Sequence, residues 1–101
     1  MLTSKTTTKS SASIQGSFKI VNKLGLHARA AALFVKTSTP FESEIFVNKG
    51  KNRVNGKSIM GLLMLAAGKG SSIKIEAQGA DAPVAIKKLG ELIAQKFHEK
   101  E

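Results

Sequence analysis

A histidine in the stretch GLHARAAALFV, residues 25–35, is the first candidate for chemistry. His27 stands between a glycine–leucine pair and an alanine-rich apolar run, and Arg29 follows two positions later. The change from glycine to a helix-forming run predicts that a helix begins beside His27. The first turn of a helix carries free backbone N–H groups and a partial positive charge, which together bind anions. The spacing therefore places an imidazole and a guanidinium at an anion-binding position.

The chemistry that suits this arrangement is a histidine that carries a phosphoryl group. The field of the helix start disfavours imidazolium, so we expect a neutral, nucleophilic ring near neutral pH. Arg29 is able to donate charge-assisted hydrogen bonds to a phosphate or a carboxylate. The spacing alone leaves a second interpretation open, in which His27 only caps the helix.

Ser58 is a second candidate, because it precedes the apolar run IMGLLMLA and is predicted to cap a second helix. A phosphate on its hydroxyl would also be stabilised by a helix start, so a modification site is the alternative to a simple cap. His98 is expected in the last turn of a terminal helix, where its ring would interact with the helix dipole. No metal or cofactor is predicted, since two isolated histidines set no ligand spacing and GKGSS at 68–72 lacks the spacing of a P-loop.

Seven elements are needed to position these residues. Alternating apolar residues predict strands at 17–21, 41–47 and 72–77, and residues 51–55 are predicted as a hairpin partner after the turn at 48–50. Helical spacing and capping signals predict helices at 28–38, from 59 to the glycine at 68, and from Asp81, as N-cap, to the end of an apolar stripe at Phe97. The order β-α-β-β-α-β-α predicts an α+β domain with a small mixed or antiparallel sheet whose helices pack on one face.

Length and composition are those of one small folded domain. The chain has 101 residues and no cysteine, which excludes disulfides and thiol catalysis. Residues 1–16 are rich in serine and threonine without the apolar segment of a secretory signal, so we expect a mobile tail followed by a domain at 17–101. No apolar run reaches the ~18 residues that span a bilayer, and a cytoplasmic protein is the expectation.

The net charge of +9 favours acidic partners. All cations except Arg29 and Arg53 are lysines spread along the chain, and there is no Tyr or Trp on which bases could stack. This pattern favours a solvated surface over a nucleic-acid groove. A lysine-rich nucleic-acid binding domain therefore stays as an alternative that explains the charge but not the arrangement of His27 and Arg29.

Two motifs together resemble a known family. NKLGLHARAA at 22–31, with NGKSIMGLLML at 55–65 and GKG at 68–70, resembles HPr, the histidine-containing phosphocarrier of the bacterial phosphoenolpyruvate-dependent phosphotransferase system. The resemblance covers roughly residues 17–98 and implies an open-faced sandwich, in which three helices cover one face of a four-stranded antiparallel sheet. It also implies a protein that is a substrate of enzymes and not a catalyst.

The resemblance assigns roles to particular residues. His27 matches the histidine that accepts a phosphoryl group on Nδ1 from enzyme I and passes it to a IIA-type acceptor, and Arg29 matches the active-site arginine. Ser58 matches the serine that an HPr kinase/phosphorylase modifies in organisms that have one. Ile59 and Met60 match the apolar surface that partners grip.

Two departures from the family pattern remain. Ala30 stands where the family usually has proline, which returns an N–H group to the first helical turn at some loss of rigidity. The polar segment before residue 17 is longer than usual. A regulatory paralogue that signals through Ser58 and no longer carries phosphate is a further alternative, against which the retention of His27 counts.

Overall fold

The computed structural model describes residues 13–101, and its elements follow the predicted order. The strands are β1 (Ser13–Lys19), β2 (Glu44–Lys49), β3 (Asn52–Asn55) and β4 (Ser72–Gln78). The helices are α2 (Ala28–Ser38), α3 (Ile59–Met64) and α4 (Ala82–Ala94), and a 3-10 turn, η2 (Lys96–His98), follows α4. None of these helices within residues 13–101 is long and apolar enough to cross a bilayer.

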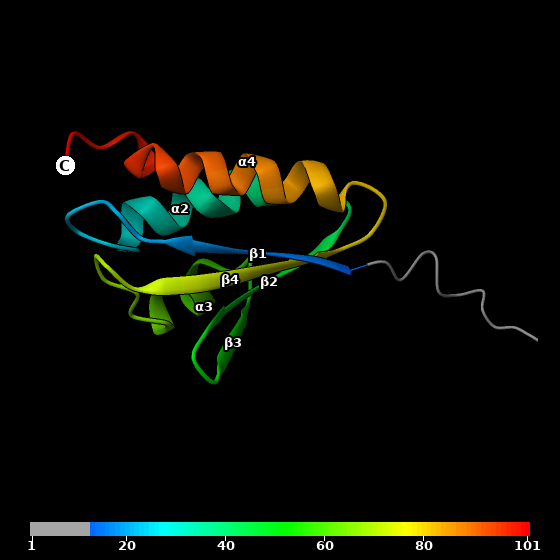
Figure 1. Ribbon diagram of the computed structural model, residues 1–101, viewed down its shortest axis with the longest axis horizontal. Helices are drawn as coiled ribbons and strands as arrows, with labels where there is room; N and C mark the ends of the chain where they lie inside the picture. The colour runs from blue at the N-terminus through cyan, green and yellow to red at the C-terminus, as the bar shows by residue number, and fades with distance from the viewer. Residues whose placement is uncertain (1–12) are drawn as a thin grey trace, which may run out of the picture.

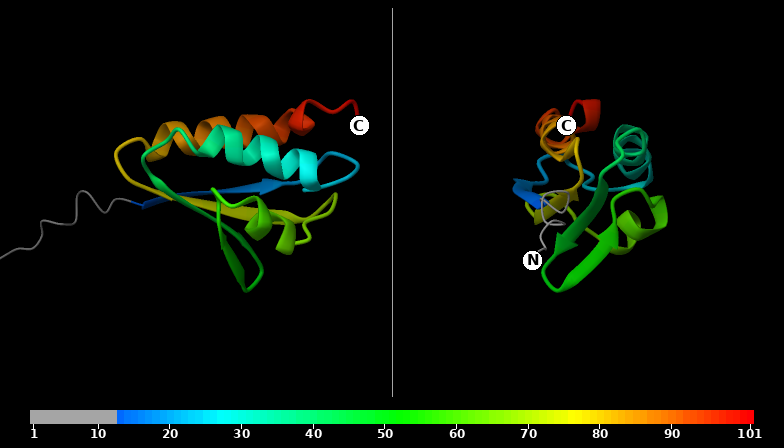
Figure 2. Two further views of the ribbon diagram at one scale, coloured as in Figure 1. Left: turned by 180° about the vertical axis from the view of Figure 1, so that it is seen from behind. Right: turned by 90° about the vertical axis from the view of Figure 1, so that its right-hand side faces the viewer.

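The four strands form one antiparallel sheet in the order β1-β4-β2-β3. Helices α2 and α4 run alongside each other over one face of the sheet (Figure 1). The short helix α3 packs against α2 and β3, near the edge of the twisted sheet (Figure 2). This is the predicted β-α-β-β-α-β-α sandwich with an open second face.

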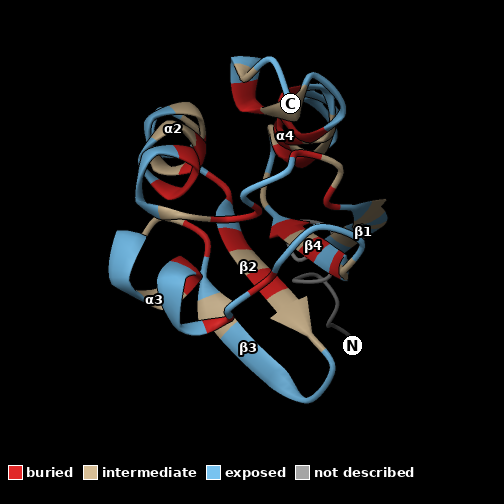
Figure 3. Cartoon of the chain, turned by 90° about the vertical axis from the view of Figure 1, so that its left-hand side faces the viewer, coloured by how far each residue is buried: buried red, intermediate tan, exposed pale blue. Residues whose placement is uncertain are grey.

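The core lies between the sheet and the helices, where Figure 3 shows the buried segments facing one another. Alternation in β4 buries Ile73 and Ile75 and exposes Lys74 between them. Phe34 of α2 and Leu89 of α4 are fully buried from the opposite side. Apolar burial on this scale is the main stabilising contribution to a domain of this size.

Two strands, β1 and β2, begin well away from their predicted first residues. Strand β1 begins at Ser13, which pairs with Gln78, so residues 13–16 belong to the sheet and not to a tail. Serines and a glycine obscured this part of the strand, although Ile14 continues the alternation and packs against the core. Residues 1–12, the rest of the predicted tail, lie outside the described residues. Strand β2 begins at Glu44 instead of residue 41.

The late start of β2 has its cause in Asp81. This residue precedes α4 as predicted, but its side chain does not cap the helix. Its carboxylate accepts hydrogen bonds from the Ser43 hydroxyl and from the backbone N–H groups of Glu42 and Ser43, the latter two at 2.9 and 3.0 Å. The Ser43 hydroxyl first, and then the Glu42 N–H group, lower the pKa of the Asp81 carboxyl. The segment before β2 is thus tied to the start of α4.

The C-terminal segment also departs from the prediction, because α4 ends at Ala94 and does not extend to residue 98. Lys96, Phe97 and His98 have φ values of 59°, 55° and 62°, a left-handed turn that non-glycine residues rarely adopt. Phe97 is fully buried by this turn. His98 is exposed and lies outside α4, so the predicted interaction with the dipole of a last helical turn is wrong.

Candidate functional site

The loop between β1 and α2 is fixed against the loop that follows α3. The backbone N–H of Leu26 donates to the carbonyl of Ala67 at 2.9 Å. Gly25 has φ +70°, and a Cβ atom there would stand 2.6 Å from the same carbonyl oxygen. Only glycine fits so close an approach in this conformation. The residues that follow the loop are therefore held in a defined position.

His27 follows this loop and is the N-cap residue of α2. Its backbone carbonyl accepts the first helical hydrogen bond, from the N–H of Ala31 at 2.8 Å. Its side chain makes no capping hydrogen bond. The imidazole is thus placed at the helix start by the backbone, and the ring itself is available for other contacts.

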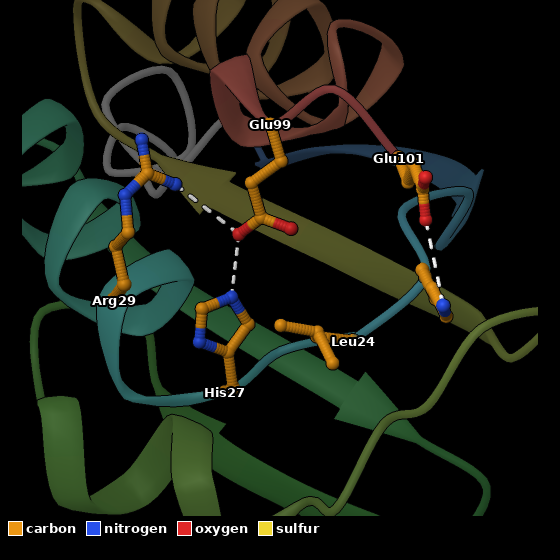
Figure 4. Close-up of a pocket in the computed structure, with 6 residues that line it drawn as sticks. Leu24, His27, Arg29, Glu99 and Glu101 are labelled. Atoms are coloured by element: carbon orange, nitrogen blue, oxygen red, sulfur yellow. Dashed lines mark hydrogen bonds and ion pairs between the residues drawn. The ribbon is translucent and has the colours of Figure 1, made fainter.

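The ring of His27 contacts a carboxylate that the sequence did not suggest. Nε2 lies 2.5 Å from Oε2 of Glu99 (Figure 4). A carboxylate has no proton to give, so Nε2 carries the proton and donates it. In the neutral ring Nδ1 then holds a free lone pair, and no group within residues 13–101 donates a hydrogen bond to it. The imidazole is 28% exposed, and Nδ1 points away from Glu99.

Arg29 contacts the same carboxylate. One guanidinium nitrogen, Nη1, donates to Oε2 of Glu99 at 3.1 Å and to the backbone carbonyl of Phe97 at 3.0 Å. The side chain is 52% exposed, as expected for the first turn of α2. The predicted pair of His27 and Arg29 does converge on an anion, and in this structure that anion is Glu99.

A buried asparagine completes the contacts to Glu99. Asn22 is fully buried, and its Nδ2 donates to Oε1 of Glu99 at 2.9 Å and to the carbonyl of Gly25 at 2.8 Å. Burial raises the pKa of the Glu99 carboxyl, but the hydrogen bonds from Asn22 and His27 and the charge of Arg29 outweigh it, and the pKa is lowered. Glu99 is therefore held as a carboxylate by three side chains.

Sequence reasoning missed both Asn22 and Glu99. Asn22 belonged to a run that looked like an ordinary turn, and Glu99 looked like the polar end of a helix. Together with their neighbours they form an open pocket of about 380 Å³ at the start of α2. Its lining residues are Lys23, Leu24, His27, Arg29, Glu99 and Glu101. Within residues 13–101, no cluster of three or more His, Cys, Asp or Glu side chains could hold a metal ion.

Ser58 lies on a separate element and caps α3 as predicted. Its Oγ accepts the backbone N–H of Gly61 at 3.0 Å. The helix that it begins presents exposed apolar side chains, including Ile59 at 41% and Met60 at 69%. Because α3 packs against α2, this apolar surface belongs to the same side of the molecule as the helix that carries His27.

Comparison with known proteins gives the same family for almost the whole described chain. The family model described as "PTS HPr component phosphorylation site" matches residues 14–95. The phosphocarrier protein HPr of Neisseria meningitidis is 52% identical over 88 residues, which cover 87% of this chain and 99% of that protein. The HPr-like protein Crh of Bacillus subtilis is 40% identical over 82 residues, 81% of this chain and 96% of that protein.

Solved structures agree in fold as well as in sequence. A crystal structure of an HPr from Thermoanaerobacter tengcongensis superposes with a TM-score of 0.84 at 46% identity, over 87% of this chain and 99% of that chain. An HPr from Bacillus anthracis superposes with a TM-score of 0.78 at 43% identity, over 81% and 98%. With its histidine at the start of α2 and its three helices on a four-stranded antiparallel sheet, the chain belongs to the HPr family of phosphocarrier proteins of the bacterial phosphotransferase system.

Proposed function

We propose that the protein accepts a phosphoryl group on His27 from phosphorylated enzyme I and passes it to a IIA-type acceptor. The observation that carries this proposal is the state of the imidazole. Its Nε2–H donates to Glu99, which leaves the lone pair on Nδ1, in a partly exposed ring at the start of α2. A nucleophile of this kind, beside backbone N–H groups that stabilise an incoming anion, suits a group carrier.

The transfer itself needs no general base on this chain. The Nδ1 lone pair attacks phosphorus, and the bond between phosphorus and the donor's nitrogen breaks with its electron pair returning to the donor. The reverse sequence delivers the group to the acceptor. Positioning and charge stabilisation carry most of the catalysis in phosphoryl transfer, and each partner supplies part of both.

Arg29 has the second role in this proposal. Its guanidinium is half-exposed and stands on the first turn of the helix that His27 begins. In the phosphorylated protein we expect Nη1 to leave Glu99 and donate to a phosphoryl oxygen. Ala30, the residue that replaces the usual proline, is fully buried in the same turn and belongs to the core.

Ser58 is proposed as a regulatory site and Ile59 and Met60 as the docking surface. The Ser58 hydroxyl is partly exposed and already acts as an acceptor for α3, so its phosphate would keep the cap. A dianion at that point would stand at the edge of the apolar surface and cost desolvation when a partner binds. Where an HPr kinase/phosphorylase exists, the protein would be its substrate.

The test is transfer to His27 in a reconstituted system. Incubated with phosphoenolpyruvate and enzyme I, the wild-type protein should gain an acid-labile, base-stable phosphoryl group. His27→Ala should abolish the gain. His98→Ala is the matched control, because His98 is the other histidine and is exposed away from α4. Phosphate uptake by His27→Ala would show that the site is wrong.

The relation to Crh favours one further candidate, a regulatory protein that acts mainly through Ser58. The two candidates differ in the same experiment. A carrier takes phosphate at His27 and donates it to a IIA domain, whereas a purely regulatory protein is modified at Ser58 only. We further propose a cytoplasmic location, because phosphoenolpyruvate, the source of the phosphoryl group in this system, is made inside the cell.

A further inference from the structure

We propose that Glu99 is a positioning residue for phosphoryl transfer, which holds the proton of His27 on Nε2 before the reaction and balances the charge of the ring after it. This inference rests on the proposed function of His27 and adds a residue to that site. It starts from a contact between the C-terminal segment and the helix start that no motif in the sequence suggested.

The hydrogen bond to Glu99 identifies the nucleophilic atom of the His27 ring. A neutral imidazole has one protonated and one unprotonated nitrogen, and the hydrogen bond made by one nitrogen sets the state of the other. Oε2 of Glu99, 2.5 Å from Nε2, accepts that proton's hydrogen bond and makes Nε2 the protonated nitrogen. The lone pair is therefore on Nδ1, on the side of the ring that faces away from Glu99 in Figure 4.

Phosphorylation changes the charge of the His27 ring. When the lone pair of Nδ1 forms the bond to phosphorus, the proton stays on Nε2 and the ring becomes an imidazolium that bears a phosphoryl group. The Glu99 carboxylate then faces a positive ring through the same hydrogen bond, which becomes charge-assisted. A positively charged ring is also the better leaving group when the phosphoryl group moves on. Glu99 thus favours both the acceptance and the release of the group.

The fold holds the Glu99 carboxylate in place beside the ring. The left-handed turn at 96–98 has three successive positive φ values, which cost conformational energy in residues other than glycine. Burial of Phe97 at the centre of the turn compensates this cost, and the chain then places Glu99 in the pocket with only 14% of its side chain exposed. Fully buried Asn22 donates to its second oxygen at 2.9 Å. An accidental contact of a chain end would have neither support.

The charged groups around Glu99 come from two segments. His27 and Arg29 face it from the start of α2, at 2.5 and 3.1 Å. Lys23 and Glu101 line the same pocket and pair with each other at 3.5 Å, with most of both side chains exposed. Glu101 therefore offers a matched control: a carboxylate of the same segment, in the same pocket, without a contact to the ring.

The experiment compares Glu99→Ala, Glu99→Gln and Glu101→Ala with the wild type. The ¹⁵N chemical shifts of the His27 ring report which nitrogen carries the proton in the unphosphorylated protein at a pH where the ring is neutral. We expect Nε2–H almost alone in the wild type and in Glu101→Ala, and a mixture of tautomers in Glu99→Ala. Glu99→Gln keeps an acceptor oxygen and should keep the tautomer while losing the charge.

The second readout is the rate of transfer from phosphorylated His27 to a IIA domain as a function of pH. Loss of one charge-assisted hydrogen bond should slow Glu99→Ala and Glu99→Gln by about tenfold or more. The loss should grow as pH rises, because the Nε2 proton is then no longer retained. Unfolding in urea checks that each variant is folded. Glu91→Ala removes an exposed carboxylate of α4 outside the pocket and should transfer at the wild-type rate over the whole pH range.

Wild-type tautomers together with wild-type rates in Glu99→Ala would overturn the proposal. Faster transfer in that variant would also overturn it, since Glu99 would then only compete with the phosphoryl group for Arg29. The tautomer measurement needs no phosphoryl donor. If the wild type itself accepts no phosphate from enzyme I, the proposed function fails, while the tautomer comparison still decides whether Glu99 positions the ring.

Discussion

Replacing Arg29 with alanine should separate the chemical role of this residue from its structural role. In the unphosphorylated protein Nη1 donates to Glu99 at 3.1 Å and to the carbonyl of Phe97 at 3.0 Å. The side chain is 52% exposed, and exposed ion pairs contribute about 0.2–1 kcal/mol. The neutral carbonyl contact is of similar size. We therefore expect Arg29→Ala to lower the free energy of unfolding by about 1 kcal/mol.

The effect on transfer should be larger than this. A hydrogen bond to a charged group contributes about 1.5–3 kcal/mol, but Arg29 must give up its pairing with Glu99 to reach a phosphoryl oxygen. The net contribution is then about 1–2 kcal/mol, which corresponds to a rate about five- to thirtyfold lower. Arg29→Lys should recover part of this loss, because the charge remains but the planar pair of donors does not.

The assay follows phosphorylation of His27 by enzyme I and its dephosphorylation by a IIA domain, with urea unfolding of each variant. Arg53→Ala is a close control: it removes the same charge from a side chain of β3 that is 53% exposed and pairs with Glu76 of β4 at 3.5 Å. Equal transfer rates in Arg29→Ala and Arg53→Ala would refute the reasoning. A loss of stability well above 2 kcal/mol would show instead that Arg29 is mainly structural.

Two further predictions concern other parts of the molecule. Ser58→Asp should slow phosphorylation by enzyme I at low salt, mainly through the association rate, and salt should reduce the difference; a rate equal to that of Ser58→Ala would leave this residue as a cap only. Hydrogen bonds from Ser43 and Glu42 lower the pKa of Asp81 in the folded state, so their stabilisation is present above the unfolded pKa and lost as pH falls through the folded one. Asp81→Asn should therefore lose stability at neutral pH and show a weaker decline in acid, as measured by urea unfolding between pH 7 and 2.

Much of the fold follows from local patterns in the sequence. The alternation in residues 72–77 places Ile73 and Ile75 in the core, and Ser58 caps α3 through the hydrogen bond that its position predicts. Such features depend on neighbours in sequence, so they can be read there. The boundaries at β1 and β2 depend on partners at the other end of the chain, Gln78 for Ser13 and Asp81 for Ser43, and were misplaced for that reason.

The functional site shows the same difference between features that depend on neighbours in sequence and features that depend on distant partners. His27 and Arg29 stand close in sequence at a predictable helix start. Asn22 and Glu99 are 77 positions apart, and they meet only because the chain turns left-handed after α4 and buries Phe97. No residue type in the last six positions encodes a left-handed turn, since glycine, its usual occupant, is absent there. The contact is a product of tertiary packing and needed a structure to be seen.

The pairing of Arg29 with Glu99 has a consequence for a protein that must both take and release a phosphoryl group. An arginine with no partner but water would stabilise an arriving phosphoryl group by the full free energy of a charge-assisted hydrogen bond. Release of the phosphoryl group would then have to overcome that same free energy. Arg29 already donates to the Glu99 carboxylate. A move to a phosphoryl oxygen would therefore add only the difference in free energy between the two hydrogen bonds. In our proposal Glu99 keeps its hydrogen bond to Nε2 and stabilises the phosphorylated ring from the side opposite the phosphoryl group, without holding the phosphoryl oxygens. Under the proposed function, we expect these two contacts to reduce the free-energy difference between the phosphorylated and unphosphorylated states, which would favour transfer in both directions.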